Sequence, residues 1–191
     1  MVRTTNEPKG FTMNQLHSSQ LTGQSFSNES IFNSQNLVFN QADLSETCKN
    51  VGQIFKPHAL KVLKSAKNFS ASMHHVQTGA LSISRLEYGA DVLIEPDQLE
   101  KFYLIQIPTR GYAEIEFGQD KFISYSEVAS IISPDQSLRM RWRAHSPQLI
   151  LKISKDDFAH HCQQHIVKSE QKNLCTRQIS QNPYPIRILP S

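Results

Sequence analysis

Glycine, cysteine and long apolar runs are all scarce in this chain of 191 residues. Seven glycines are too few for a glycine-rich phosphate loop, and no Gly-x-Ser-x-Gly nucleophile motif occurs. Three cysteines without Cys-x-x-Cys spacing indicate neither a disulfide framework nor a zinc knuckle, so a reduced cytoplasmic setting is the simplest interpretation. No run approaches the roughly 20 apolar residues of a membrane span. The N-terminus also lacks the apolar run of a signal peptide.

The histidines are spaced unfavourably for a metal centre. His74 and His75 are adjacent, so on a strand they point to opposite faces and cannot both bind one ion. His161 and His165 stand four apart on an expected helix, a spacing that can bind zinc, but no glutamate of a zinc protease motif lies between them. We therefore expect no metal, no cofactor and no catalytic residue, and predict that the chain is not an enzyme.

Charge is distributed unevenly along the chain. The net charge is +3, yet from Leu138 onward nine Lys or Arg residues stand against three acidic residues. Two interpretations are open: a basic surface that faces nucleic acid, or a solvated strand face followed by a basic tail.

Residues 79–153 consist of short apolar segments separated by Gly and Pro, a pattern typical of a small barrel or sandwich. In several segments apolar and polar residues alternate, which predicts strands with one face toward a core. The apolar faces predicted in this way are Leu138, Met140 and Trp142; Ala113, Ile115 and Phe117; and Leu149, Leu151 and Ile153.

The segment from Leu81 to Tyr88 breaks the alternation. Either a β-bulge lies near Ser84 and Arg85, or Arg85 points inward on the face of Leu81 and Ile83. A charge that points into a barrel needs a partner, and a bound ligand is one such partner. An inward guanidinium would hold a carboxylate through a bidentate fork.

Three further side chains are candidate ligand contacts. Tyr103, Gln106 and Trp142 lie on strands that should line the barrel, and the rings of Tyr103 and Trp142 could cover an aromatic ligand. The same residues also suit a filled core, and both interpretations are open. With Arg85 they predict a site for a small carboxylate, such as an aromatic acid.

Helices are expected on both sides of the strands. Asp43–Phe55 predicts a helix that Asp43 or Ser45 caps. After Ile153, Ser154 is a good N-cap, and Phe158, Cys162 and Ile166 form an apolar stripe at a spacing of four. We predict that this stripe mediates dimerisation. The expected organisation is a polar, disordered segment at 1–40 with one strand near 37–39, a sensing domain at 41–167, and an irregular tail at 168–191.

Five segments in order resemble the N-terminal effector-sensing domain of AraC/XylS-type transcription regulators. They lie at Val51–Leu60, Gly79–Val92, Tyr103–Gly111, Ile132–Pro134 and Leu138–Ile153, within a resemblance that covers Asp43 to Phe158. Two features depart from that family. Glu127 stands where a turn glycine is usual, and nothing after Phe158 resembles a helix-turn-helix unit.

The resemblance implies a mainly β fold: a cupin-like β-barrel with a short N-terminal helix and a C-terminal helix. It implies a small organic effector, often an aromatic acid, and a homodimer or a heterodimer with an intact regulator. Without the helix-turn-helix units, the chain alone is expected not to bind DNA specifically. The alternatives are a cupin-type small-molecule enzyme and a decayed, truncated regulator with no ligand.

Overall fold

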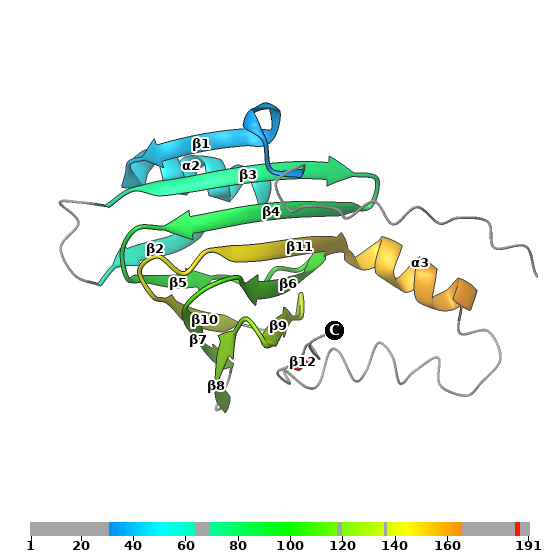
Figure 1. Cartoon of the computed structure of the whole chain (residues 1–191). Helices are drawn as coiled ribbons and strands as arrows, with labels where there is room; N and C mark the ends of the chain where they lie inside the picture. Colours follow the sequence, from blue (N-terminus) through cyan, green and yellow to red (C-terminus); the bar gives the residue numbers. More distant parts are fainter. Residues whose placement is uncertain (1–30, 64–68, 118–119, 136, 166–185, 188–191) are drawn as a thin grey trace, which may run out of the picture.

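Antiparallel strands make up most of the computed structural model, which describes residues 31–63, 69–117, 120–135, 137–165 and 186–187 (Figure 1). The helices are α2 (Leu44–Ile54) and α3 (Lys155–His165), and a short 3-10 turn, η1, spans Ser34–Asn36. The strands are β1 (Leu37–Ala42), β2 (His58–Val62), β3 (Ala71–Thr78), β4 (Leu81–Tyr88), β5 (Val92–Pro96), β6 (Phe102–Pro108), β7 (Tyr112–Phe117), β8 (Asp120–Tyr125), β9 (Val128–Ile132), β10 (Leu138–Trp142), β11 (Gln148–Ser154) and β12 (Ile186–Arg187).

The strands form one continuous sheet that folds over into two layers. Its order is β1-β3-β4-β11-β6-β9-β8-β7-β10-β5-β2, and β12 pairs with β9. We call β1-β3-β4-β11-β6 the first layer and β8-β7-β10-β5-β2 the second layer; β9 pairs with both. The predicted fold, a cupin-like β-barrel with one helix before and one after it, is confirmed.

Side chains from the inner faces of both layers form the core. Trp142 of the second layer packs against Tyr88 of the first, with 5.4 Å between the ring centroids. Along β10 the residues Leu138, Met140 and Trp142 are buried, as the alternation predicted. Ala113 and Ile115 of β7 are buried in the same way, whereas the side chain of Phe117 lies outside the described residues.

The sequence predicted that Leu149, Leu151 and Ile153 of β11 face the core, and this prediction is wrong. Gln148 and Ile150 are buried, and Leu149, Leu151 and Ile153 lie half-buried on the outer face. The outer face of the first layer is itself apolar, because Leu151 stands beside Ile83 of β4 and Ile105 of β6. Apolarity therefore does not identify the inner face of this strand.

Both interpretations of the β4 segment are also wrong. The pairing of β4 with β3 and with β11 runs through Arg85 without a register shift, so there is no bulge. Arg85 is exposed on the outer face, which it shares with Leu81 and Ile83. The inner face carries two small buried residues, Ser82 and Ser84, which hydropathy does not mark as core.

Helix α2 lies against the inner side of the first layer and buries Thr47 and Val51 (Figure 1). Asp43 is its N-cap, and its side chain accepts a 2.8 Å hydrogen bond from the backbone N–H of Glu46. At the other end, the Lys152 Nζ donates to the carbonyl oxygen of Ile54 at 2.6 Å. Upstream, β1 joins the sheet beside β3, so the predicted domain boundary at residue 40 falls within a strand.

Helix α3 follows β11 directly and packs on the first layer. The Ser154 hydroxyl accepts from the backbone N–H of Asp157, which confirms the predicted N-cap. Phe158 stacks on Tyr103 with 4.9 Å between ring centroids. Of the stripe predicted for dimerisation, Phe158 thus contacts its own barrel, Cys162 is half-buried, and Ile166 lies outside the described residues.

We expect Phe158→Ala to lower the free energy of unfolding by about 1–2 kcal/mol, because it removes an aromatic pair that holds α3 on the barrel. Chemical denaturation measures this loss. Asp156→Asn, on the exposed side of the same helix, is the control and should change stability by only a few tenths of a kcal/mol. Unchanged stability combined with loss of a dimer in sedimentation would instead assign Phe158 to an interface.

Candidate functional site

A pocket opens between the inner faces of the two layers, beside the C-terminal end of α2. Its cavity volume is about 40 Å³, which holds a few water molecules, so a larger ligand must displace part of the wall. The wall is mostly apolar. It is formed by Val51, Phe55, Lys56, His58, Leu86, Tyr88, Ile94, Pro96, Leu99, Leu104, Gln106, Leu138, Met140, Trp142 and Ile150.

Three polar atoms on this wall are buried without a hydrogen-bond partner in the described part of the protein. They are Oε1 of Gln106, Nε1 of Trp142 and Nε2 of His58. Gln106 and Trp142 are each only 2% exposed, so water reaches neither freely. An unpaired buried polar group costs about 1–3 kcal/mol, and three of them on one apolar wall require an explanation.

The roles of the His58 ring nitrogens follow from its neighbour. His58 Nδ1 lies 2.8 Å from the carbonyl oxygen of Lys56. A carbonyl oxygen can only accept, so Nδ1 carries the proton and donates it. In the neutral ring Nε2 is then a hydrogen-bond acceptor on the pocket wall.

The aromatic part of the wall is rigid. Tyr88 lies between Trp142 and Phe69, with ring centroids 5.4 Å and 6.2 Å away. Complete burial raises the pKa of Tyr88 far above its ordinary value, so the side chain stays a neutral phenol. The indole and phenol rings, inclined to each other by 49°, give this part of the wall two aromatic surfaces for a ligand ring to contact.

Gln148 adds further unpaired atoms on the inner face. It is fully buried, and both Oε1 and Nε2 of its amide lack a partner among the described residues. On the strand register Gln148 stands opposite Pro108 of β6, two residues from Gln106, which faces Ile150. The inner wall of β6 and β11 is thus more polar than a core needs to be.

At the mouth of the pocket, Lys56 joins α2 to the loop that follows β5. Its Nζ donates to the carbonyl oxygen of Gln98 at 2.6 Å and to Glu100 Oε1 at 2.9 Å. The hydrogen bond from Lys56 lowers the pKa of the Glu100 carboxyl. The charge of Lys56 is therefore neutralised in this arrangement.

The structure brings together only part of the predicted ligand site. Gln106 and Trp142 lie on the same pocket wall. Tyr103 is buried on the opposite face of β6 under Phe158, and Arg85 is on the outside of the barrel. The prediction that Arg85 points inward to hold a carboxylate is wrong, because β4 keeps a regular register and places Arg85 outward.

Sequence reasoning missed His58 and Gln148. The inward position of His58 could have been predicted from the sequence. Pro57 ends the preceding helix, and His58 is then the first residue of a strand, β2, on its more buried face. Nothing in the sequence indicates that Gln148 is buried, because a polar residue on a strand is expected to face solvent.

In the part of the chain described, no three His, Cys, Asp or Glu side chains lie close enough together to hold a metal ion. His75 Nδ1 lies 2.8 Å from the Ser84 hydroxyl, and burial lowers the pKa of His75. Burial also raises the pKa of the Cys48 thiol, which disfavours the thiolate. Among the helices described, none is long and apolar enough to cross a membrane.

Two arginines of β10, and Arg143 directly after it, form an ion-pair network on the outer face of the second layer. Arg139 pairs with Glu95 at 2.6 Å, and Arg143 pairs with the buried Asp91 at 3.1 Å. Arg141 lies between Asp91 and Glu114, at 3.8 Å and 4.0 Å. The pairing of these three arginines agrees with the solvated strand face of the second interpretation, whereas most of the basic tail that it included lies outside the described residues.

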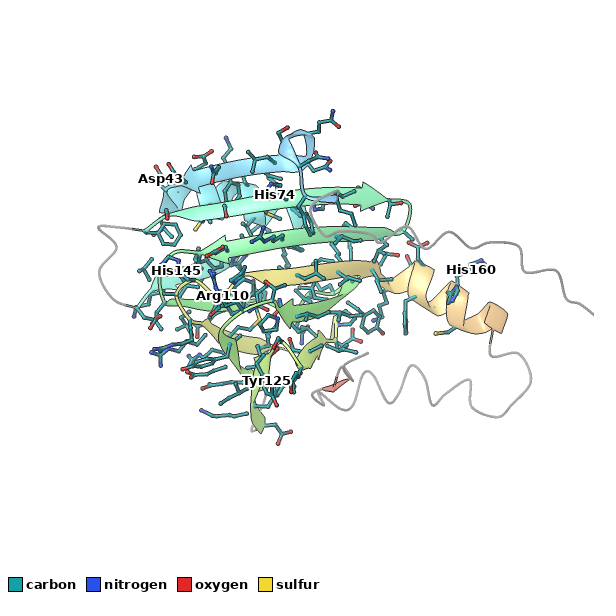
Figure 2. The ribbon with its side chains drawn as sticks, in the orientation of Figure 1. Asp43, His74, Arg110, Tyr125, His145 and His160 are labelled. Carbon is teal, nitrogen blue, oxygen red and sulfur yellow. The ribbon has the colours of Figure 1, made fainter. Side chains whose placement is uncertain are left out.

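A second cluster of charges lies at the edge of the first layer. Arg110 and His145 are adjacent (Figure 2), and Arg110 Nε donates to the carbonyl oxygen of His145 at 3.2 Å. Glu87 lies within 3.4 Å of Arg110 and 3.5 Å of His145. His74 lies on the outer face of β3, opposite Arg85 in the strand register and away from the pocket.

We expect Gln148→Met to raise the free energy of unfolding by about 1 kcal/mol or more, because it replaces two unpaired buried polar atoms with an apolar side chain of similar length. Thermal or urea denaturation measures the gain. Gln53→Met, at an exposed position on α2, is the matched control and should be neutral. A destabilised Gln148→Met would show that the amide is paired in solution.

Comparison with known proteins identifies relatives of this architecture. Residues 48–183 match the family described as the AraC-binding-like domain. A probable thc operon regulatory protein of Rhodococcus erythropolis is 25% identical over 115 residues, 60% of this chain and 35% of the relative. XylDLEGF operon transcriptional activator 3 of Pseudomonas putida is 25% identical over 124 residues, 64% of this chain and 37% of the relative. The chain spans little more than a third of these regulators.

Among solved structures, the AraC-like transcriptional activator CuxR has the same fold in its matching part. The TM-score is 0.52 at 14% sequence identity, over 64% of this chain and 49% of that chain. At this identity the likeness concerns the fold alone.

Proposed function

Because the chain belongs to the family of AraC-binding-like domains, we propose that it senses a small organic effector for transcription regulation. The effector binds in the pocket between the two β layers. The observation that carries this proposal is the set of buried, unpaired polar atoms on an apolar wall, at His58, Gln106 and Trp142. Ligand pockets combine apolar surface with a few placed polar groups in this way.

The arrangement suits binding better than turnover. A purely structural core would gain stability from apolar side chains at the unpaired positions, whereas a ligand that hydrogen-bonds to them removes the cost of burial. The wall offers an indole donor with an amide and an imidazole acceptor, which orient a bound molecule. We therefore propose a sensor and not a cupin-type enzyme.

Effector entry requires the mouth to move, since the cavity is small. The Lys56–Glu100 contact holds the end of α2 against the loop after β5. Ile150 of the pocket wall lies on β11, and the same strand leads directly into α3. We propose that occupancy shifts α2 and β11 and thereby changes how α3 is presented to the rest of a regulator.

Association of two copies, or of this chain with an intact regulator, is a further part of the proposal. Phe158 is engaged by Tyr103, so α3 offers less free apolar surface than the sequence indicates. The half-buried Cys162 of α3 and the outward residues of β11 are the groups through which we propose contact. Such a dimer would be weak.

The only tryptophan in the chain is a built-in reporter of the pocket. We expect effectors from a panel of small aromatic molecules to change Trp142 fluorescence saturably and to raise the melting temperature. Ile150→Phe, which fills the cavity, should weaken binding about tenfold or more. Tyr103→Phe, on the opposite face of β6, is the control and should bind normally. Equal binding by wild type and Ile150→Phe would contradict this site.

We expect the 191-residue chain alone not to bind DNA selectively, because Arg139, Arg141 and Arg143 are already paired with acidic residues. A gel shift at physiological salt with specific and scrambled operator DNA tests this. Binding that disappears between about 50 and 200 mM salt would report only exposed basic side chains. Nanomolar, sequence-selective binding would contradict the expectation.

A further inference from the structure

Among the described residues, the pocket wall carries two hydrogen-bond acceptors and one donor that are buried without a partner. We infer that the effector is a neutral, planar molecule that carries N–H or O–H donors, such as an aromatic primary amide, and that the pocket discriminates against carboxylates. This inference rests on the proposed function and names the class of ligand for the same pocket.

The two acceptors are fixed by the protein. His58 donates its Nδ1–H to the carbonyl oxygen of Lys56, which leaves Nε2 as an acceptor. Gln106 Oε1 is the second, on a side chain that is almost fully buried. No described residue donates to either acceptor, so a ligand that displaces water from the cavity has to supply the donors itself.

The donor is the indole N–H of Trp142, which has no acceptor partner among the described residues. An aromatic primary amide matches this set: its two N–H bonds suit His58 and Gln106, and its carbonyl oxygen suits Trp142. Its ring suits the Trp142 and Tyr88 surfaces. A carboxylate offers acceptors only, so it would place its charge against two further acceptors.

A buried carboxylate would also need a cation, and the wall provides none that is free in the part of the chain described. Lys56, at the mouth, is bonded to Gln98 and Glu100. Lys152 donates to the carbonyl oxygen of Ile54 and lies 4.8 Å from the Phe102 ring. Arg85, next to Leu86 of the wall, is on the outside of the barrel. Arg139, Arg141 and Arg143, which adjoin wall residues of β10, are ion-paired with acidic residues on the outer face.

The test compares three probes of similar shape at pH 8: benzamide, benzoate and toluene. Each is titrated into the full chain up to its solubility limit, with Trp142 fluorescence and calorimetry as readouts. Fragments of this size bind weakly, so dissociation constants in the millimolar range are sufficient. We expect benzamide to bind at least about tenfold more tightly than benzoate and than toluene.

Two variants test whether the pocket wall causes the preference for benzamide. Gln106→Leu removes one acceptor and should weaken benzamide binding about tenfold while toluene binds as well or better. Arg85→Met is the matched control outside the barrel and should leave the affinities for benzamide and benzoate unchanged. A drop in affinity for either probe in Arg85→Met would overturn the inference.

The outcomes separate this inference from the proposed function. Benzoate binding as tightly as benzamide, or toluene doing so, would overturn the inference and leave an effector pocket in place. No saturable binding of any of the three probes would overturn both.

Discussion

The packing of the two β layers on each other is the constraint on which the rest of the structure depends. Trp142 and Tyr88 meet at its centre, one from each layer, and both are almost completely buried. Because these large rings keep the inner faces apart, a space remains between Met140 and Ile150 on one side and the end of α2 on the other. The pocket and its mouth follow from that spacing.

The two outer faces of the barrel have opposite chemistry, and this decided which strands could be predicted. On β10, Arg139 and Arg141 mark the solvent side, so the inward position of Trp142 followed from alternation. On β11 the outer residues are as apolar as the inner ones, and the parity of Gln148 and Ile150 could not be deduced. The same ambiguity misplaced Arg85 on β4.

Part of the candidate site could be predicted from the sequence, namely the residues with large side chains on strands that line the barrel. Gln106 and Trp142 were identified because amides and indoles on strands are common ligand contacts, and both lie on the pocket wall. His58 gains its role from the carbonyl of Lys56, a backbone contact that no side-chain pattern reveals. Tyr103 was misassigned because the helix that covers it, α3, begins 52 residues later in the chain, at Lys155.

The amide atoms of Gln106 and Gln148 that lack a partner among the described residues have an evolutionary consequence. Apolar replacements at these positions remove the cost of burying a polar group, so a copy that no longer binds an effector would accumulate them by drift. Selection for ligand binding is the pressure that opposes such drift. A decayed regulator and a working sensor would therefore diverge first inside the barrel, at residues that have no effect on the surface of the protein.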